Sequence, residues 1–256
     1  MITPRNYAAF SIFTASFPQR RKEMEEEKKQ RTIKERTRTL VECAALIALG
    51  TVLSLIKIPI GHLGGSVTLL SALPLVIICY RHGAKWGFLS TFIYSLLQML
   101  VDIPTVVKIF APGEGLVWYM AMLSIFLDYV FAFSIIGLAS VVRNIKNPTA
   151  ALSVGALVGL TARYISHFFS GWIFYGAWAS WYFDAAEEGS FASQSDWAAK
   201  FGAWVLEHLG SGQALSAFYS AFYNGLYMIP EIILTVIGAV GVSFIPFVVN
   251  KNKTIR

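Results

Sequence analysis

The chain has 256 residues, of which 55% are hydrophobic and only 14% are charged, and its mean hydropathy is +0.57. These values lie outside the usual range of water-soluble domains. The formal net charge of +6 does not require a nucleic-acid partner, because no RNA- or DNA-binding module is visible and basic loops are typical of membrane proteins, where they also attract anionic lipid.

The apolar residues gather in six stretches. All except the second are near or above the ~20 residues that a bilayer core requires. We expect helices at 39–57, 66–81, 86–103, 116–142, 151–178 and 214–248. The second stretch is short, so it is expected to lie partly at the interface or to form an irregular span. The sequence therefore predicts an all-α, polytopic membrane protein with six transmembrane helices.

The distribution of Lys and Arg near the ends of the spans predicts the orientation. One side carries Arg31, Lys34, Arg36, Arg38, Arg81, Lys85, Arg143, Lys146, Lys251, Lys253 and Arg256. The other side carries Lys57, Lys108 and Lys200, and its fifth loop is acidic. Both termini are therefore expected in the cytoplasm. The protein is expected to be a multi-pass protein of the cell membrane, which here means a bacterial plasma membrane.

The same pattern divides the chain into three parts. We expect a charged cytoplasmic tail at 1–38, a six-helix membrane domain at 39–250 and a basic cytoplasmic tail at 251–256. The tail at 1–38 is interpreted as a solvated helix, with a docking element as the alternative.

An extracellular insertion is expected at 179–213. It contains a helix-like piece at 196–209 and several aromatic residues, Trp181, Tyr182, Trp197 and Trp204. Anchoring at the membrane interface is the favoured interpretation, and a lid over an outward-facing pocket is the alternative.

Three helices carry a polar residue at one depth. Asp128, His167 and Asn224 each lie about 10–12 residues from the outer end of their predicted helix, which is ~15–18 Å at 1.5 Å per residue. Ionisable groups inside a membrane usually face the bundle interior. An acid, an imidazole and an amide at one level predict a pocket for a small molecule.

Aromatic residues surround this level at helical spacing. Tyr129 adjoins Asp128, Gly171 and Tyr175 follow His167 at i+4 and i+8, Tyr219 precedes Asn224, and Trp118 lies near the outer end of its helix. Gly171 is expected to leave room for a flat ring. Rings and one carboxylate favour a flat, cationic, hydrogen-bonding ligand. Packing or interfacial anchoring is the alternative for a single ring, and an interhelical hydrogen bond is the alternative for His167.

Two further features lie away from this level. Arg163 and Glu231 differ in predicted depth by only ~3 Å, so we expect a buried ion pair with a structural role. Ala44 and Ala48 stand at i and i+4 in a patch of small residues. Such a patch lets another helix approach closely, either within this chain or from a membrane partner.

Motifs for energy conversion and catalysis are absent from the sequence. It contains no G-x-x-x-x-G-K-[ST] segment, no H-E-x-x-H or Cys/His metal spacing and no G-x-S-x-G elbow. We therefore expect a binding subunit with no catalytic activity and no cofactor, which relies on the energy source of another protein.

At these residues the sequence resembles the thiamine-specific substrate-binding (S) component of energy-coupling factor transporters. The resemblance rests on Gly64-Gly65-Ser66-Val67 before Pro74, Arg81-His82-Gly83, Phe126-Leu127-Asp128-Tyr129, the run from Ala162 to Gly171, Tyr219-Ser220, Tyr223-Asn224-Gly225 and Pro230-Glu231. In order and spacing these elements span roughly residues 40–248.

The resemblance implies a six-helix fold that binds thiamine from outside, together with a transmembrane coupling protein and two cytoplasmic ATPases. It implies ligand contacts at Asp128, Tyr129, His167, Gly171, Tyr175, Tyr219 and Asn224, with Trp118 near the entrance. It also implies that Ala44 and Ala48 contact the coupling protein. The chain departs from some relatives in having Asp128 for Glu, Tyr175 for Trp and Gly65 for an aromatic residue.

Other functions stay open at this point. The chain could be an S component for another vitamin or for the thiamine precursor hydroxymethylpyrimidine. It could also be a stand-alone secondary transporter. An intramembrane enzyme that uses Asp128 and His167 as acid and base is a third alternative.

Overall fold

The computed structural model describes residues 4–60, 65–110 and 116–251, with side chains from Met24 onward. Gly64 of the resemblance, and Lys253 and Arg256 of the basic tail, lie outside the described residues. The chain forms two compact units, residues 1–44 and 45–256. Helix α1, Pro4–Ser54, contributes residues to both units.

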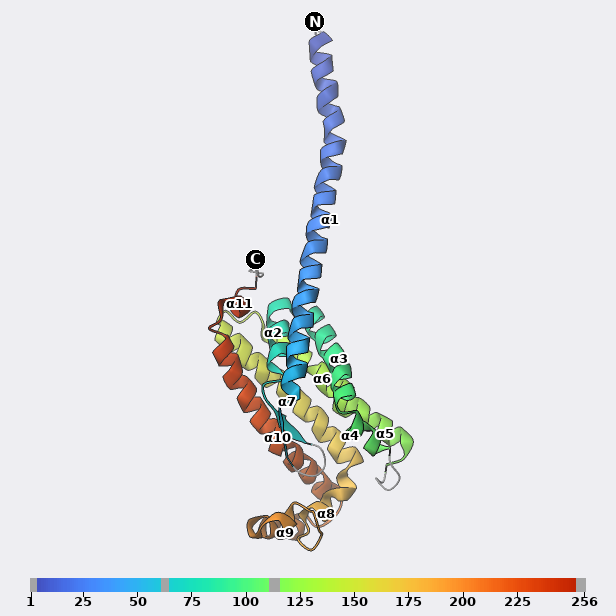
Figure 1. Ribbon diagram of the computed structural model, residues 1–256, viewed down its shortest axis with the longest axis vertical. Coiled ribbons are helices and arrows are strands. Elements are labelled where there is room, and N and C mark those ends of the chain that lie inside the picture. Colours follow the sequence, from blue (N-terminus) through green and yellow to red (C-terminus); the bar gives the residue numbers. More distant parts are fainter. Residues whose placement is uncertain (1–3, 61–64, 111–115, 252–256) are drawn as a thin grey trace. The chain divides into compact units, whose positions relative to one another are not determined.

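Most of the second unit is helical (Figure 1). After α1 its elements are β1 (Lys57–Pro59), β2 (Ser66–Thr68), α2 (Leu73–His82), α3 (Ala84–Val101), α4 (Ile103–Ile109), α5 (Trp118–Ile125), η1 (Phe126–Phe131), α6 (Ala132–Ser134), η2 (Ile135–Val142), α7 (Pro148–Phe174), η3 (Gly176–Trp178), α8 (Ala179–Phe183), η4 (Ala192–Gln194), α9 (Asp196–Leu209), α10 (Gln213–Val242) and α11 (Pro246–Val249).

The two longest helices of this unit, α7 and α10, lie side by side along most of their length (Figure 1). Helix α2 packs against α3, η2 and α7, and its apolar side chains form a core with Leu152 and Ala156 of α7 and Ala239 of α10. Small residues allow close packing here. A Cβ on Gly159 of α7 would lie 2.9 Å from the backbone carbonyl oxygen of Ile136, so the backbones of α7 and η2 approach each other closely here.

The apolar stretch from Trp118 to Val142 changes its helical type along its length. It begins as an α-helix, widens to a π-helix at η1, and tightens to a 3₁₀ helix at η2. Single turns of π-helix inside α-helices are frequently found at functional sites in other proteins. The π-turn here carries Asp128 and Tyr129, and Ser166 of α7 donates a hydrogen bond to the carbonyl oxygen of Leu127 (2.8 Å).

The prediction of a helix at 66–81 is wrong for residues 66–72, which precede the helix. Strand β2 pairs antiparallel with β1, with Val67 opposite Ile58, and β-branched residues such as these favour a strand. The helix begins only at Leu73. Its first turn contains Pro74, which is tolerated there because the first N–H groups of a helix have no intrahelical partner.

Two other helix boundaries also differ from those expected. α7 begins earlier, because the Asn147 side chain accepts a hydrogen bond from the Ala150 N–H and caps the helix. α10 ends at Val242 rather than near 248, and Pro246, which lacks an N–H, begins the separate helix α11. The helix expected at 196–209 is present as α9.

Four helices of the described chain are long and apolar enough to cross a bilayer: Met24–Ser54, Trp118–Val142, Pro148–Phe174 and Gln213–Val242. A fifth crossing is available if α3 and α4, which are bent by 75°, form one broken span. Helix α2 has ten residues and reaches about 15 Å, which is half of a bilayer core.

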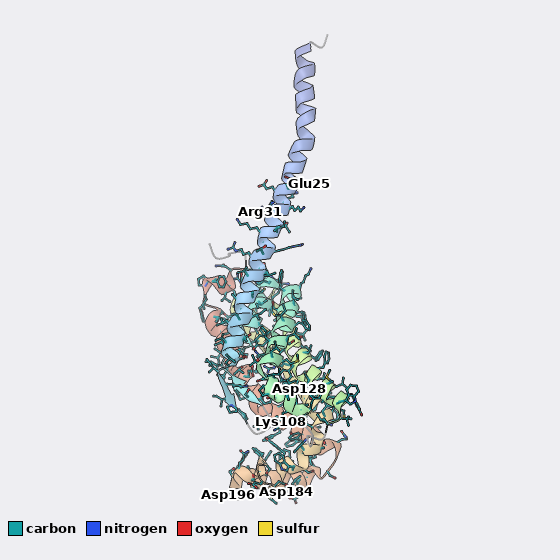
Figure 2. All side chains as sticks on the ribbon, turned by 45° about the vertical axis from the view of Figure 1, so that its right-hand side comes forward. Glu25, Arg31, Lys108, Asp128, Asp184 and Asp196 are labelled. Atoms are coloured by element: carbon teal, nitrogen blue, oxygen red, sulfur yellow. The ribbon has the colours of Figure 1, made fainter. Side chains whose placement is uncertain are left out.

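Basic residues that are far apart in sequence meet at the end of the second unit near α11. Arg143 donates hydrogen bonds to the carbonyl oxygens of Tyr80 (3.2 Å) and Arg81 (3.0 Å). Lys251 donates to the carbonyl oxygen of Arg143 and lies 4.2 Å from the centre of the Tyr80 ring. Burial, together with the nearby Arg143, lowers the pKa of Lys251. The opposite end of this unit carries α8 and α9 with Asp184 and Asp196 (Figure 2).

Candidate functional site

A cavity of about 270 Å³ lies among the helices of the second unit, just below the usual range of about 300–1,000 Å³ for small-molecule sites. Its walls come from β2, the α3–α4 bend, η1, α6, α7 and α10. The lining residues are Gly65, Ser66, Asp102, Thr105, Lys108, Ile109, Asp128, Tyr129, Phe133, Arg163, His167, Gly171, Tyr175, Tyr219, Tyr223, Asn224 and Tyr227.

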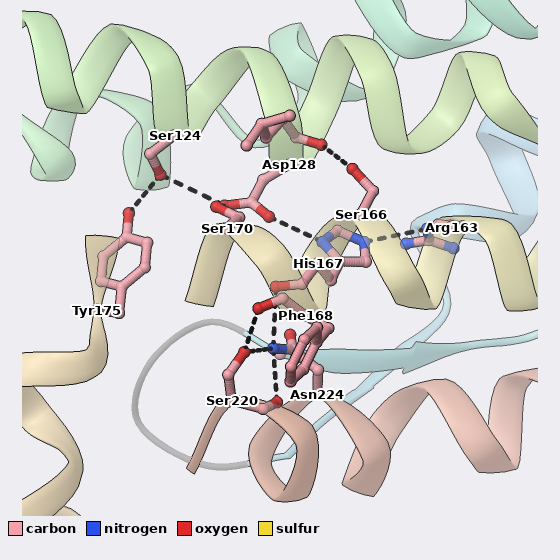
Figure 3. Close-up of polar contacts among 12 residues, drawn as sticks. Ser124, Asp128, Arg163, Ser166, His167, Phe168, Ser170, Tyr175, Ser220 and Asn224 are labelled. Atoms are coloured by element: carbon pink, nitrogen blue, oxygen red, sulfur yellow. Dashed lines mark hydrogen bonds and ion pairs between the residues drawn. The ribbon is translucent and has the colours of Figure 1, made fainter. Parts of the chain in front are cut away.

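Asp128 is held by three side chains (Figure 3). Its Oδ1 lies 2.9 Å from His167 Nδ1, and its Oδ2 accepts hydrogen bonds from Ser170 (2.6 Å) and Ser124 (3.3 Å). A quarter of the Asp128 side chain is still exposed, on the side of the cavity. Asp128 therefore has a fixed orientation and an open face.

His167 lies between Asp128 and Arg163. Arg163 Nε is 3.3 Å from His167 Nε2, and a guanidinium nitrogen can only donate. We therefore assign the acceptor lone pair to Nε2 and the imidazole proton to Nδ1, which donates to Asp128. In this arrangement the imidazole is neutral and both of its nitrogens are already hydrogen-bonded.

The expected ion pair of Arg163 and Glu231 is present, and it lies on the side of His167 that faces away from Asp128. Arg163 Nη1 lies 2.9 Å from Glu231 Oε1, and both side chains are buried. The guanidinium also lies 4.1 Å from the centre of the Phe133 ring, a cation–π contact. Glu231, Arg163, His167 and Asp128 together carry two negative charges and one positive charge. Among these four groups one negative charge is unbalanced, and Asp128 is the carboxylate that reaches the cavity, whose lining also includes the ammonium group of Lys108.

Asn224 is engaged within the protein. Its Nδ2 donates to the carbonyl oxygens of Ser220 (2.9 Å) and His167 (3.2 Å), and its Oδ1 accepts from the Tyr227 hydroxyl (2.5 Å). Asn224 thus ties α10 to α7 at the level of His167. The second lone pair of its Oδ1 is still available to a ligand.

Gly171 has a different role from the one expected. A Cβ at this position would lie 2.3 Å from Ser220 Oγ and 3.0 Å from Asn224 Nδ2. The space beside Gly171 is therefore filled by α10 and not by a ring. Its lack of a side chain permits the close approach of α7 and α10 that places Asn224 near His167.

Tyrosines form much of the cavity wall. Tyr175 shares a hydrogen bond of 2.8 Å with Ser124, which also donates to Asp128. On α10, Tyr219, Tyr223 and Tyr227 follow one another at i+4 spacing, and the first two are stacked with ring centroids 5.9 Å apart. Tyr227 was not expected at the site, and Tyr223, although it precedes Asn224, was not among the expected ligand contacts; the i+4 spacing from Tyr219 would have found both.

Other lining residues come from bends and loops. The Gly65 N–H donates to the Tyr223 hydroxyl (2.9 Å), and a Cβ on Gly65 would lie 2.6 Å from the Tyr227 ring. An aromatic side chain therefore has no room at position 65, and α10 supplies the rings instead. Asp102 and Lys108 were also not expected. Asp102 pairs with Lys57 at 2.9 Å.

Three expected site residues are not among the residues that line the cavity. Trp118 is 74% exposed and its ring contacts Tyr119, so it is not part of the lining. Ala44 and Ala48 are exposed on α1. The remaining expected ligand contacts, Asp128, Tyr129, His167, Gly171, Tyr175, Tyr219 and Asn224, all line the cavity.

The segment between α7 and α10 packs on the tyrosine wall. Tyr182 of α8 stacks on Phe191 (5.3 Å between centroids) and meets Tyr219 and Tyr223 edge to face at 5.1 and 5.8 Å. Tyr182 is buried. It therefore connects the α8–α9 segment to two residues of the cavity.

Membrane-spanning helices, a ring-lined cavity and one unbalanced carboxylate define a class: polytopic membrane proteins with an internal site for a small polar molecule. Within this class the chain matches the family model described as Thiamine transporter protein (Thia_YuaJ) over residues 40–183. The match covers more than half of the chain, and the chain belongs to this family, as the resemblance predicted. It is a multi-pass protein of the cell membrane and a transporter, not an enzyme.

Individual relatives agree with this assignment. The thiamine transporter ThiT of Bacillus subtilis (strain 168) is 25% identical over 214 residues, which cover 77% of this chain and 86% of that protein. The solved structure of ThiT from Listeria monocytogenes matches with a TM-score of 0.57 and 22% identity, covering 84% of this chain and 98% of that one. At this identity the likeness applies to the fold.

Proposed function

We propose that this chain is the membrane-embedded thiamine-binding subunit of an ATP-driven vitamin uptake transporter. The observation that carries the proposal is the position of Asp128, whose carboxylate holds the one unbalanced negative charge of a buried network and faces a cavity lined by five tyrosines. Thiamine is a monocation with two flat rings. A fixed anion beside aromatic faces suits such a ligand through charge and cation–π attraction.

Five of the expected contacts receive a role. Asp128 attracts the thiazolium charge, and Tyr175 and Tyr219 stack on the rings. Asn224 Oδ1 accepts a hydrogen bond from the aminopyrimidine. His167, whose two nitrogens are already engaged, orients Asp128 and presents its ring to the ligand.

The proposed topology has six crossings with both termini in the cytoplasm. α2 is too short to cross alone, and we propose that strand β2 and the turn after it, residues 66–72, complete the second crossing. Irregular backbone is tolerated at membrane depth where it is buried or lines a cavity. Val67, Ser71 and Ala72 are buried, and Ser66 lines the cavity. The basic cluster of Arg143 and Lys251 marks the cytoplasmic end.

Transport is proposed to require a transmembrane coupling protein and two cytoplasmic ATPases. The absence of a phosphate-binding loop from the sequence supports this dependence. Ala44 and Ala48, exposed on α1, provide a surface on which another membrane helix can approach closely.

Titration of the purified protein with thiamine tests the proposal. Thiamine is expected to quench tryptophan fluorescence saturably, because Trp178 and Trp181 pack against the cluster that contains Tyr182 and the cavity residue Tyr219. Competition with hydroxymethylpyrimidine and with other vitamins distinguishes the substrate. Uptake is then measured in vesicles with and without the ATPases. The proposed subunit should accumulate thiamine only in vesicles that contain the ATPases, whereas a stand-alone secondary transporter would accumulate it in both kinds of vesicle.

A further inference from the structure

Helix α9 has three distinct faces. Its exposed polar strip contains Asp196, Lys200, Ala203 and Glu207, and its buried strip contains Ala198, Gly202 and Val205. At about 100° per residue, Trp197, Phe201, Trp204 and His208 form a third strip, which lies between the other two. We call this third set the aromatic strip.

The rings of the aromatic strip are stacked along the helix. Trp197 and Phe201 are parallel with centroids 5.4 Å apart, Phe201 and Trp204 follow at 6.2 Å, and Trp204 and His208 at 4.6 Å. Trp197 is 65% exposed and Trp204 is 51% exposed. Helix α9 therefore exposes large aromatic rings directly beside its polar strip.

The position of α9 on α10 indicates what those surroundings are. Ile229, Ile233 and Ile237 form an exposed apolar row on α10, and Phe218 and Phe222 continue this row because they lie about three and two turns before Ile229. Phe201 of α9 packs on Phe222 with centroids 5.1 Å apart and on Phe218 at 6.4 Å. α9 thus covers one end of the lipid-facing row of a membrane-spanning helix.

We infer that the aromatic strip of α9 is an interaction surface for the lipid headgroup region of the membrane. The apolar row of α10 reaches α9 at Phe222 and Phe218, so lipid that contacts Ile229 lies about two helical turns from the part of α10 that α9 covers. Trp rings prefer this zone because one edge is polar and the rest is apolar. The polar strip then faces water. In the proposed topology this interface belongs to the outer leaflet.

Matched pairs of spin labels test the inference on the full-length protein in phosphatidylcholine nanodiscs. Cysteine is introduced by His208→Cys or Trp197→Cys in the aromatic strip, and by the neighbouring Glu207→Cys or Asp196→Cys in the polar strip. All four positions are exposed, and the native Cys43 and Cys79 are buried, so wild-type protein treated with the label serves as the blank. Collision rates with O₂, which concentrates in lipid, and with a water-soluble nickel chelate are compared.

Labels at 197 and 208 are expected to give a higher ratio of O₂ to nickel collisions than labels at 196 and 207. The 207 and 208 pair gives the clearest comparison, because neither substitution removes a packed tryptophan. Equal ratios at all four positions would overturn the inference. So would the reverse order, or a strip shielded from both reagents, which would indicate a protein partner. None of these outcomes depends on thiamine binding.

Discussion

Arg163 and His167 stand one turn apart on α7, and Arg163 Nε donates to His167 Nε2 over 3.3 Å. This contact determines which imidazole nitrogen carries the proton, because arginine cannot accept. It leaves His167 neutral with Nδ1–H directed at Asp128. A buried ion pair on one side of His167 thereby determines the imidazole tautomer that faces Asp128 on the other side.

Arg163→Lys separates these two functions of Arg163. A lysine ammonium can pair with Glu231, but it lacks the planar fork that also reaches His167. We expect a melting temperature close to that of the wild type and thiamine binding about 2- to 10-fold weaker, as for the loss of one hydrogen bond. Titration measures the affinity, and ¹⁵N NMR of His167 should show Nδ1–H alone in the wild type. A wild-type spectrum with a proton on Nε2 contradicts the assignment.

Reversing the charges of the buried pair tests the pairing itself. Arg163→Glu or Glu231→Arg alone leaves two like charges buried, and disrupting such a pair costs about 3–5 kcal/mol. The double reversal should recover folded yield and melting temperature. It should not recover thiamine binding, because an arginine on α10 would not make the contact that Arg163 makes with His167 from α7. A double variant no more stable than either single variant refutes the pairing.

Gly171→Ala should separate α7 from α10. The new Cβ would meet Ser220 Oγ at 2.3 Å, and overpacking of this kind costs about 1–3 kcal/mol. Thermal unfolding should show the loss, and affinity should fall with it because Asn224 and His167 move apart. Gly241→Ala on α10 is the matched control, since a Cβ there meets no atom within 4 Å and alanine favours the helix. Equal effects of the two substitutions would contradict the account.

Tyr182 connects α8 to Tyr219 and Tyr223, so Tyr182→Ala should release both rings. Removing a buried ring of this size costs about 3–5 kcal/mol. We expect faster dissociation of thiamine, measured by stopped-flow fluorescence. Tyr182→Phe keeps the ring and should restore the wild-type rate. If Tyr182→Phe is as impaired as Tyr182→Ala, the ring contacts are not the cause.

Helical periodicity was sufficient to bring Asp128 and His167 together. Residues at equal depth on neighbouring helices meet if both face the interior, and their distance is 2.9 Å. The same argument anticipated the depth of Arg163 and Glu231. The i,i+4 spacing also makes Arg163 a neighbour of His167 on one helix face, but the pattern alone did not show that the guanidinium would reach both His167 and Glu231.

Residues on irregular backbone were harder to predict. Asp102 and Lys108 line the cavity because α3 and α4 are bent by 75°, and a bend angle depends on tertiary packing. Gly65 lies under Tyr227 through the β1–β2 pairing, which competed with the helix expected at 66–81. For Gly171, the sequence showed that a side chain was missing but not that Ser220 would fill the space.

The affinity of purified Asp128→Asn protein for thiamine, beside that of the wild type, is the most direct test. Asparagine is nearly isosteric and can keep hydrogen bonds with Ser170 and His167, so the protein should remain folded. Loss of the charge should weaken binding about 10- to 100-fold, as expected for a hydrogen bond or contact to a charged group. An unchanged affinity in this folded variant would remove the Asp128 carboxylate from thiamine recognition and contradict the account.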